Sequence, residues 1–425
     1  MMGRPPGARR RLRRAAEWIA LALVGVAASA QSISEAPKVV GFPAGPFVIA
    51  PSLTAGYSYD SNVYLRSEEA SPSPDQVLTV QPAVQLTIPF SNSMLRLGDT
   101  LTYLDYKRTS QTAGKTSNDA VADLTLNFAS QDTLELSVHH IAGVAETLAF
   151  DPGGEAAFQG NAYRLHTEGV SASREVVGGR GYRFALQRTA VRFDRSLNVP
   201  FIDYRGFDGE GAYLQPLSSN TRLAFGYLGA RYDQFAIGPS SDPTEVFRTE
   251  RGDSVYAQIE GRLGPRQPYS LRLGWERLDF GLNAAARDFS GLIGQASVTA
   301  IVGGGTTFTV VAHRQPYRSS VPDNNYYLFD QIGGSVERRF PLGSLVGGDV
   351  SLSQNSYGQP TSPGSTEPGI LRRDRTIRLE VYANLTVADH VVFRVSILKN
   401  RKYSNFPGAD YNDTVVFGGF VLGWI

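Results

Sequence analysis

The sequence predicts an all-β fold, a transmembrane up-and-down antiparallel β-barrel, from three observations. Many segments alternate apolar and polar residues with a period of two, short and long connections alternate between them, and no apolar run beyond the N-terminus reaches helix-spanning length. The segment FVIAPSLTAGYSYD, residues 47–60, shows the alternation, with Tyr57 on one face and Ser58 on the other. In such a barrel the apolar face points to lipid and the polar face lines the lumen.

The first thirty residues have the layout of a secretory signal peptide. Six arginines precede an apolar run, WIALALVGVAASA at 18–30, which ends in the small residues Ala28-Ser29-Ala30. A membrane-spanning helix needs about 20 residues, so this shorter run is expected to be cleaved rather than to remain as an anchor.

Removing residues 1–30, which carry six Arg and one Glu, changes the formal net charge from +1 to −4. A nucleic acid is therefore not expected as a partner. The chain has no cysteine, which excludes disulfides, thiolate metal ligands and thiol catalysis. The expected organisation is a leader at 1–30, a short periplasmic segment at 31–46 and the barrel at 47–425.

Eight tight connections recur at a spacing of about 40 residues, as hairpin turns would. They are SNS 91–93, SQD 130–132, VGGRG 177–181, LSSNT 217–221, LGPRQ 263–267, GGGT 303–306, PLGS 341–344 and VADH 387–390. Long polar connections lie at the opposite ends of the same strands, at 107–117, 145–161, 194–203, 234–252, 278–289, 315–325, 355–374 and 400–412. This alternation is typical of an outer-membrane barrel with short periplasmic turns and long outer loops.

Two strands per tight turn, together with the first and last strands, predict eighteen strands, with sixteen left open. Segments 163–175 and 204–216 are polar on both faces, and 182–193 changes parity midway, which predicts a β-bulge. Asp99 lies in the lipid-facing parity of its strand. The last strand is expected to pair with the first, near 47–59, because an unpaired edge in lipid leaves backbone groups unsatisfied.

Residues 51–64, PSLTAGYSYDSNVY, resemble the opening strand of an outer-membrane β-barrel porin family associated with exopolysaccharide synthesis and export loci. That family has a Pro-Ser-Leu start, an alternating strand and then Tyr-Asp-x-Asn-Val-Tyr. The matching residues here are Tyr59, Asp60, Asn62, Val63 and Tyr64. The resemblance implies a role in moving a surface polysaccharide, with periplasmic polysaccharide-export proteins as partners, and supplies no catalytic residues.

Charged residues of inward parity are the candidate lining of the lumen. They are Glu260, Arg262, Arg272, Glu276, Arg378, Glu380 and Arg394. They either neutralise one another across strands or form a charged constriction that filters solutes, and both interpretations stay open. Glu260 is predicted to meet Arg272 in an ion pair or shared network, with paired residue numbers summing near 532. Four tyrosines are candidates for stacking on sugar rings, namely Tyr256, Tyr326, Tyr327 and Tyr382.

The histidines predict no metal site, and no cofactor is expected. His139 and His140 are adjacent in a strand, so they point to opposite faces and do not share a metal ion. Ser137 shares the lumenal face with His139, but no third member of a catalytic triad is evident. An enzyme is therefore not predicted.

Together these features predict a conduit in the outer membrane of a Gram-negative bacterium, in contact with outer-membrane lipid and inserted by the barrel-assembly machinery. The leading role is export of a surface exopolysaccharide. The alternative is a general diffusion porin for small solutes, and a third possibility is an outer-membrane enzyme or adhesin. Neighbouring polysaccharide-export genes would favour the first role, and liposome swelling by small sugars would favour the second.

Overall fold

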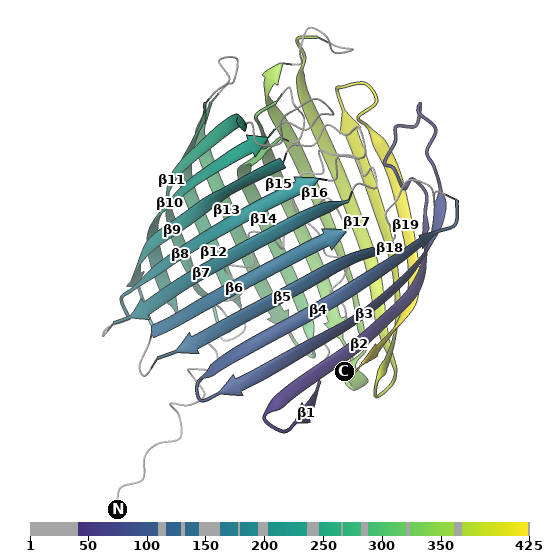
Figure 1. Ribbon diagram of the computed structural model, residues 1–425, viewed down its shortest axis with the longest axis horizontal. Helices are drawn as coiled ribbons and strands as arrows, with labels where there is room; N and C mark the ends of the chain where they lie inside the picture. The colour runs from purple at the N-terminus through teal and green to yellow at the C-terminus, as the bar shows by residue number, and fades with distance from the viewer. Residues whose placement is uncertain are drawn as a thin grey trace, which may run out of the picture.

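The computed structural model describes residues 41–108, 116–128, 132–143, 162–176, 179–193, 203–235, 246–264, 267–281, 288–319, 324–360 and 368–423. Eighteen long antiparallel strands form one closed wall, and a short strand, β1, lies beside β2 (Figure 1). The prediction of an eighteen-strand barrel is confirmed. The predicted leader at 1–30 lies outside the described residues.

The strands follow one another around the wall in chain order, each antiparallel to the next. Their bounds are β1 Phe42–Ala44, β2 Phe47–Asp60, β3 Asp75–Phe90, β4 Ser93–Tyr106, β5 Thr116–Asn127, β6 Asp132–Gly143, β7 Tyr163–Glu175, β8 Gly181–Phe193, β9 Asp203–Pro216, β10 Thr221–Phe235, β11 Val246–Arg262, β12 Pro268–Gly281, β13 Phe289–Val302, β14 Thr306–Arg318, β15 Tyr326–Arg339, β16 Leu345–Pro360, β17 Leu371–Ala388, β18 Val391–Ser404 and β19 Tyr411–Gly423. A short 3₁₀ turn, η2, spans Pro341–Gly343. Within the described ranges, no helix is long and apolar enough to cross a bilayer.

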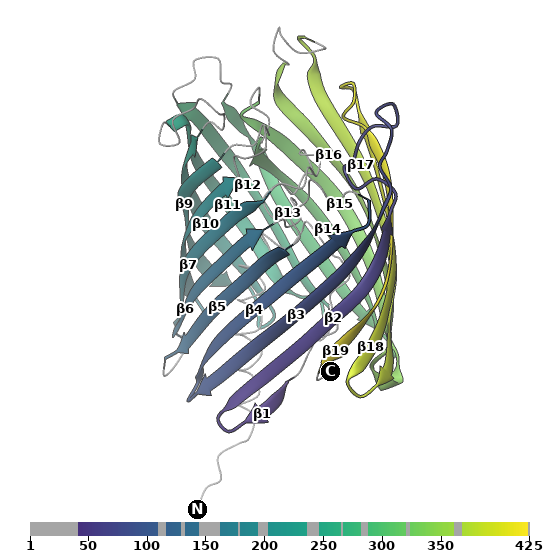
Figure 2. The same cartoon turned by 45° about the vertical axis from the view of Figure 1, so that its right-hand side comes forward.

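The last strand closes the wall by pairing with β2, as predicted (Figure 2). The pairs run from Val415 opposite Asp60 to Gly423 opposite Ser52. Below that point the strand β1 pairs with the first residues of β2, so the edge of β2 is covered where β19 has ended. The sequence did not predict β1, because three residues are too few to show a periodicity.

Several strands continue beyond the points where sequence reasoning ended them. The predicted connection 234–252, for example, contains the end of β10 and the start of β11, which pair from Phe235 and Val246 onward. Sequence reasoning ended each strand where the apolar alternation ended. Backbone pairing does not require lipid-facing side chains, so the ladder continues past the apolar band.

The β-bulge predicted in β8 is absent, since β8 pairs without a register shift with both β7 and β9. The apolar parity changes for another reason. Leu186 is exposed on the outer face, whereas Val191 is buried on the inner face, and Arg188 and Arg192 are exposed on the outer face above Leu186. The lipid-facing apolar band therefore ends within this strand.

Asp99 lies on the outer face of β4, between the exposed side chains of Leu97 and Leu101. Its Oδ1 accepts a hydrogen bond of 2.7 Å from Nδ2 of Asn118 on β5. The carboxylate therefore has a polar partner on its own face of the wall, which sequence reasoning did not find.

Candidate functional site

The candidate site is the inner face of the barrel wall. Large exposed apolar residues, such as Val255, Leu271 and Leu379, mark the outer face of their strands. The seven charged residues predicted to line the lumen all have the opposite parity, because strand residues alternate between the two faces. Among the described residues, no group of His, Asp or Glu is arranged to hold a metal ion.

One polar network centres on Glu210 of β9. Its Oε1 lies 3.0 Å from Nη2 of Arg183 on β8 and 3.4 Å from Nη2 of Arg272 on β12. The Tyr256 hydroxyl on β11 also donates a hydrogen bond to Glu210. Sequence reasoning missed Glu210 and Arg183, because 204–216 is polar on both faces and Arg183 lies in the strand with the apparent parity change.

The network continues toward the end of the wall that carries the short turns. Arg272 Nε donates to Gln258 Oε1 at 2.7 Å, Gln258 Nε2 donates to Glu260 Oε2 at 2.5 Å, and Glu260 is ion-paired with Arg222. Glu260 and Arg272 therefore share a network, as predicted, with Gln258 between them. The numbers of paired residues sum to 530 rather than to the predicted 532, because Gln258 stands opposite Arg272 and Glu260 stands opposite Ser270.

A second polar group lies on β15–β18. The Tyr382 hydroxyl donates to Glu337 Oε1 at 2.6 Å, and Arg378 Nη2 lies 3.0 Å from Glu380 Oε2. Arg394 is only 5% exposed, yet its Nε and Nη2 have no hydrogen-bond partner among the described residues. This wall therefore holds a buried guanidinium with two nitrogen atoms from which no described residue accepts a hydrogen bond.

The other predicted lumenal residues have separate positions. Glu276 is buried on the inner face of β12, and its Oε2 has no hydrogen-bond partner among the described residues. Arg262 is the last residue of β11, beside the short turn. The seven charges thus belong to different parts of the inner face rather than to one ring.

At its outer end the β14–β15 hairpin separates from the backbone of β13, while β15 stays paired with β16 as far as Tyr327. Pairing of β13 with β14 stops at Gly294 opposite Arg314, whereas pairing of β14 with β15 continues to Arg318 opposite Tyr326. Beyond Arg314 the hairpin therefore has no backbone pairing with β13. We name residues 315–319 and 324–329 the inward hairpin.

Three contacts place the inward hairpin inside the barrel. Arg318 Nε lies 2.8 Å from Glu250 Oε2 of β11, and the Tyr326 ring lies with its centroid 5.9 Å from that of Phe280 and 5.4 Å from that of Phe289. Glu250, Phe280 and Phe289 have inward parity on β11, β12 and β13, so the hairpin leans across the inner face of those strands.

Further contacts hold both faces of the inward hairpin. Arg248 Nη1 donates to the Asn324 carbonyl at 3.1 Å and also bonds Asn325. On the other face, Tyr327 and Phe329 form a buried cluster with Tyr357 of β16. The hairpin is thus fixed by polar and aromatic contacts, and it occupies lumenal space near the long-loop end.

The four candidate sugar-stacking tyrosines are mostly covered. Tyr256, Tyr327 and Tyr382 are buried, and Tyr326 is stacked against Phe280. A sugar ring would reach their faces only if neighbouring side chains moved. Their role in binding sugar stays a prediction.

His139 and His140 point to opposite faces of β6, as predicted. His139 Nε2 lies 2.7 Å from Asp119 on the inner face, whereas the His140 ring contacts His166 of β7 on the outer face. His139 is thus engaged with a carboxylate rather than with Ser137.

A scan of family models finds no match to the chain, and a search of curated proteins finds none. Solved structures of outer-membrane proteins do share its fold. The outer-membrane protein OpdK from Pseudomonas aeruginosa aligns with 88% of this chain and 99% of its own, at 11% identity and a TM-score of 0.50. OccAB2 from Acinetobacter baumannii aligns with 90% of this chain and 100% of its own, at 10% identity and a TM-score of 0.50.

At these identities the similarity shows the fold alone. The fold is the closed antiparallel barrel of Gram-negative outer membranes, and this chain is an outer-membrane protein. The short turns accordingly face the periplasm and the long connections face outward.

Proposed function

We propose that the chain is a passive diffusion channel for small polar solutes. The observation that carries the proposal is an eighteen-strand wall with a polar inner face, narrowed near the outer end by the inward hairpin. Barrels of this size enclose an aqueous channel, and inward loops or charges then set which solutes pass. The solved structures with the same fold include porin-like barrels, which supports this choice over an enzyme.

The paired charges of the inner face support a channel for neutral and zwitterionic solutes. Glu210 is ion-paired with Arg183 and Arg272, and Glu260 is ion-paired with Arg222. Paired charges present alternating donors and acceptors along a solute's path rather than a field of one sign. This arrangement supports the interpretation in which the lumenal charges pair with one another, and a charged constriction stays a prediction.

Export of an exopolysaccharide was the leading expectation, and no observation on the described residues favours it. The residues that carried the family resemblance have a structural role at the closing seam. Asn62 is fully buried, bonds the backbone of Arg66 through both of its side-chain atoms, and donates to the Asn412 carbonyl on β19. Residues that fix a turn to a seam carry no information about the solute.

Liposome swelling and single-channel recording test the proposal. Purified protein should make liposomes swell in small sugars and amino acids, with a sharp decline as solute size increases. The double variant Arg318→Ala with Tyr326→Ala removes two of the side chains that hold the inward hairpin against β11–β13, and it should raise single-channel conductance and admit larger sugars. Arg314→Ala is the matched control, because Arg314 belongs to the same hairpin but pairs with Asp330 on the outer face.

Two outcomes would contradict the proposal. The first is a correctly inserted protein that neither conducts ions nor swells liposomes. The second is a deletion strain that loses surface polysaccharide while its uptake of small solutes is unchanged, which would restore the export role.

A further inference from the structure

The outer face of β7–β12 changes from apolar to charged at the outer side of the wall. Exposed arginines of outward parity occur on every one of these strands. They are Arg164 on β7, Arg188 and Arg192 on β8, Arg205 on β9, Arg231 on β10, Arg251 on β11 and Arg277 on β12. Such a stripe is unusual on a surface that meets lipid, where charged side chains are costly near the midplane and tolerated near the interfaces.

These arginines form two directly opposed pairs, Arg164 with Arg192 in the β7–β8 ladder and Arg231 with Arg251 in the β10–β11 ladder. The second pair lines a hollow of the outer face. Like charges directly opposite across strands are destabilising. Arg188 lies 3.3 Å from Glu168 and Arg277 lies 2.8 Å from Asp279. Arg231 and Arg251, by contrast, form no ion pair within the described residues, although Asp279 stands opposite Arg251 on β12 and Asp253 lies two residues after Arg251 on the same face.

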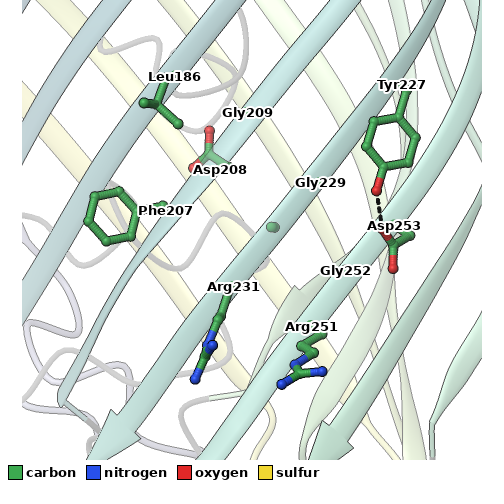
Figure 3. A pocket seen from close by; sticks show the side chains of 11 residues that line it. Leu186, Phe207, Asp208, Gly209, Tyr227, Gly229, Arg231, Arg251, Gly252 and Asp253 are labelled. Atoms are coloured by element: carbon green, nitrogen blue, oxygen red, sulfur yellow. Dashed lines mark hydrogen bonds between the residues drawn. The ribbon is translucent and has the colours of Figure 1, made fainter.

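A groove on the outer face begins at this arginine pair. It has a volume of about 430 Å³ and is lined by Leu186, Phe207 and Tyr227 together with the glycines Gly209 and Gly229 (Figure 3). Figure 3 shows Arg231 and Arg251 side by side on neighbouring strands, with Phe207 and Leu186 on the strands beyond. Because glycine has no side chain, the outward glycines leave the space that forms the groove.

The groove continues toward the periplasmic side over apolar residues. A second hollow of about 290 Å³ shares Leu186 and Gly209 with the first and extends along Phe184, Ala172 and Gly211. The combined surface is an apolar trough with two arginines at its outer end. Its shape and chemistry suit an acyl chain joined to an anionic headgroup.

The level of the arginine pair matches the outer leaflet. Arg231 lies ten residues after Thr221, the periplasmic start of β10. At a rise of about 3.3 Å per residue and a tilt of about 40°, this places Arg231 about 25 Å above the periplasmic end, near the outer edge of the apolar band. An anionic group bound there belongs to a lipid of the outer leaflet.

We propose that the outer face of β8–β11 is a binding site for lipid A, the phosphorylated glycolipid anchor of the outer leaflet. One phosphate lies between Arg231 and Arg251, and one acyl chain lies in the groove over Gly229 and Gly209. The phosphate removes the repulsion between the two guanidinium groups, which are well suited to bidentate phosphate contacts. The acyl chain fills the space that the glycines leave open.

Native mass spectrometry of the full-length barrel in detergent tests the site. The probes are purified bisphosphorylated lipid A, the same lipid after removal of its phosphates, and phosphatidylglycerol. Wild-type protein should retain one molecule of lipid A more tightly than either of the others. The double variant Arg231→Gln with Arg251→Gln should bind lipid A at least about tenfold more weakly, because two charge-assisted contacts are lost.

Two single variants separate a built site from general surface charge. Arg164→Gln removes an exposed arginine of β7 that lines neither hollow, so lipid A binding should be unchanged. Gly209→Leu fills the groove, and a Cβ at Gly209 meets its nearest neighbours only at 3.5 Å, so the strand tolerates it. The Gly209→Leu protein should bind lipid A more weakly than the wild type. In electrophoresis without heating it should still migrate as a folded barrel, like the wild type.

Three results would overturn the proposal. Unchanged lipid A binding by the double variant would exclude the arginine pair. Equal binding of phosphatidylglycerol and lipid A would show an ordinary phospholipid site. An equal loss in Arg164→Gln would show diffuse charge attraction instead of a site.

Discussion

The lumenal walls β9–β12 and β15–β18 carry the same side-chain types in the same order, six strands apart. In each wall a tyrosine lies across a glycine of the preceding strand and donates its hydroxyl to a glutamate one strand further back. An amide residue follows two positions after the tyrosine, and an arginine stands opposite it on the next strand. In β9–β12 the set is Glu210, Gly226, Tyr256, Gln258 and Arg272. In β15–β18 the set is Glu337, Gly347, Tyr382, Asn384 and Arg394.

The two walls differ at the arginine. Arg272 donates from Nε to Gln258 at 2.7 Å and from Nη2 to Glu210 at 3.4 Å. The same two atoms of Arg394, Nε and Nη2, have no partner among the described residues, and Asn384 Oδ1 has none either. Asparagine is one methylene shorter than glutamine, so its oxygen does not reach an arginine on the neighbouring strand.

The comparison separates a wall whose arginine is hydrogen-bonded from one whose arginine and amide have unpartnered atoms among the described residues. A buried donor without a partner costs about 1–3 kcal/mol, so an unsatisfied arginine does not stabilise the barrel. In an aqueous lumen, water and passing solutes can supply the missing acceptor. Arg394 and Asn384 are therefore the positions at which the β15–β18 wall is less satisfied than the β9–β12 wall.

The largest expected effect comes from removing the central carboxylate of the satisfied wall. Glu210→Gln leaves Arg183 and Arg272 without a negative partner in a largely buried setting, and breaking such a pair costs about 3 kcal/mol. Urea-induced unfolding in lipid vesicles measures the loss. The matched change Glu337→Gln should cost less than about 1 kcal/mol, because the Tyr382 hydroxyl can donate to the glutamine oxygen instead.

Equal losses in Glu210→Gln and Glu337→Gln would show that the two walls are energetically alike. That result would remove the distinction between a satisfied and an unsatisfied wall, since this distinction depends on Glu210 being the ion-pair partner of two arginines.

Much of the fold follows from the sequence because strand period and connection length are local signals. The eighteen strands and the seam between β2 and β19 were predictable for that reason. The β10–β11 extension was not, because it depends on backbone pairing above the apolar band. The apparent irregularity in β8 was read as a bulge, although it marks the level at which the lipid-facing residues become charged.

The candidate site was less predictable than the fold. Parity alone placed Arg272 and Glu260 on the inner face, but the partner of each depends on register and side-chain length. The inward hairpin depends on Arg318 meeting Glu250, a contact between residues 68 positions apart. No local pattern in a single sequence signals such a contact.

A smaller expected effect comes from the glycines beneath the tyrosines. A Cβ at Gly226 or Gly347 would collide with the ring of Tyr256 or Tyr382. Gly226→Ala should therefore displace the ring and cost about 2 kcal/mol in urea-induced unfolding. The loss in Gly347→Ala should be smaller, since displacing Tyr382 disturbs one hydrogen bond to Glu337 rather than a network.

The control for the glycine variants is Gly418→Ala on β19, where a Cβ would meet no heavy atom within 4 Å. Its free energy of unfolding should equal that of the wild type. A cost in Gly418→Ala as large as that in Gly226→Ala would assign the effect to strand glycines in general and not to the ring above them.

The smallest expected effect comes from exchanging the two amides. Asn384→Gln extends the side chain opposite Arg394 by one methylene and can supply an acceptor like that of Gln258, which should stabilise the barrel by about 1 kcal/mol. Gln258→Asn should have the opposite sign and a similar size, because it withdraws the acceptor of Arg272 at 2.7 Å.

Single-channel recording adds a second measurement. If Arg394 meets solute through its free donors, Asn384→Gln should weaken the effect of acetate on the open-channel current, whereas Gln258→Asn should strengthen it. A stabilised Asn384→Gln protein with unchanged acetate sensitivity would mean that Arg394 is only a packing residue, and the difference between the walls would then concern stability alone.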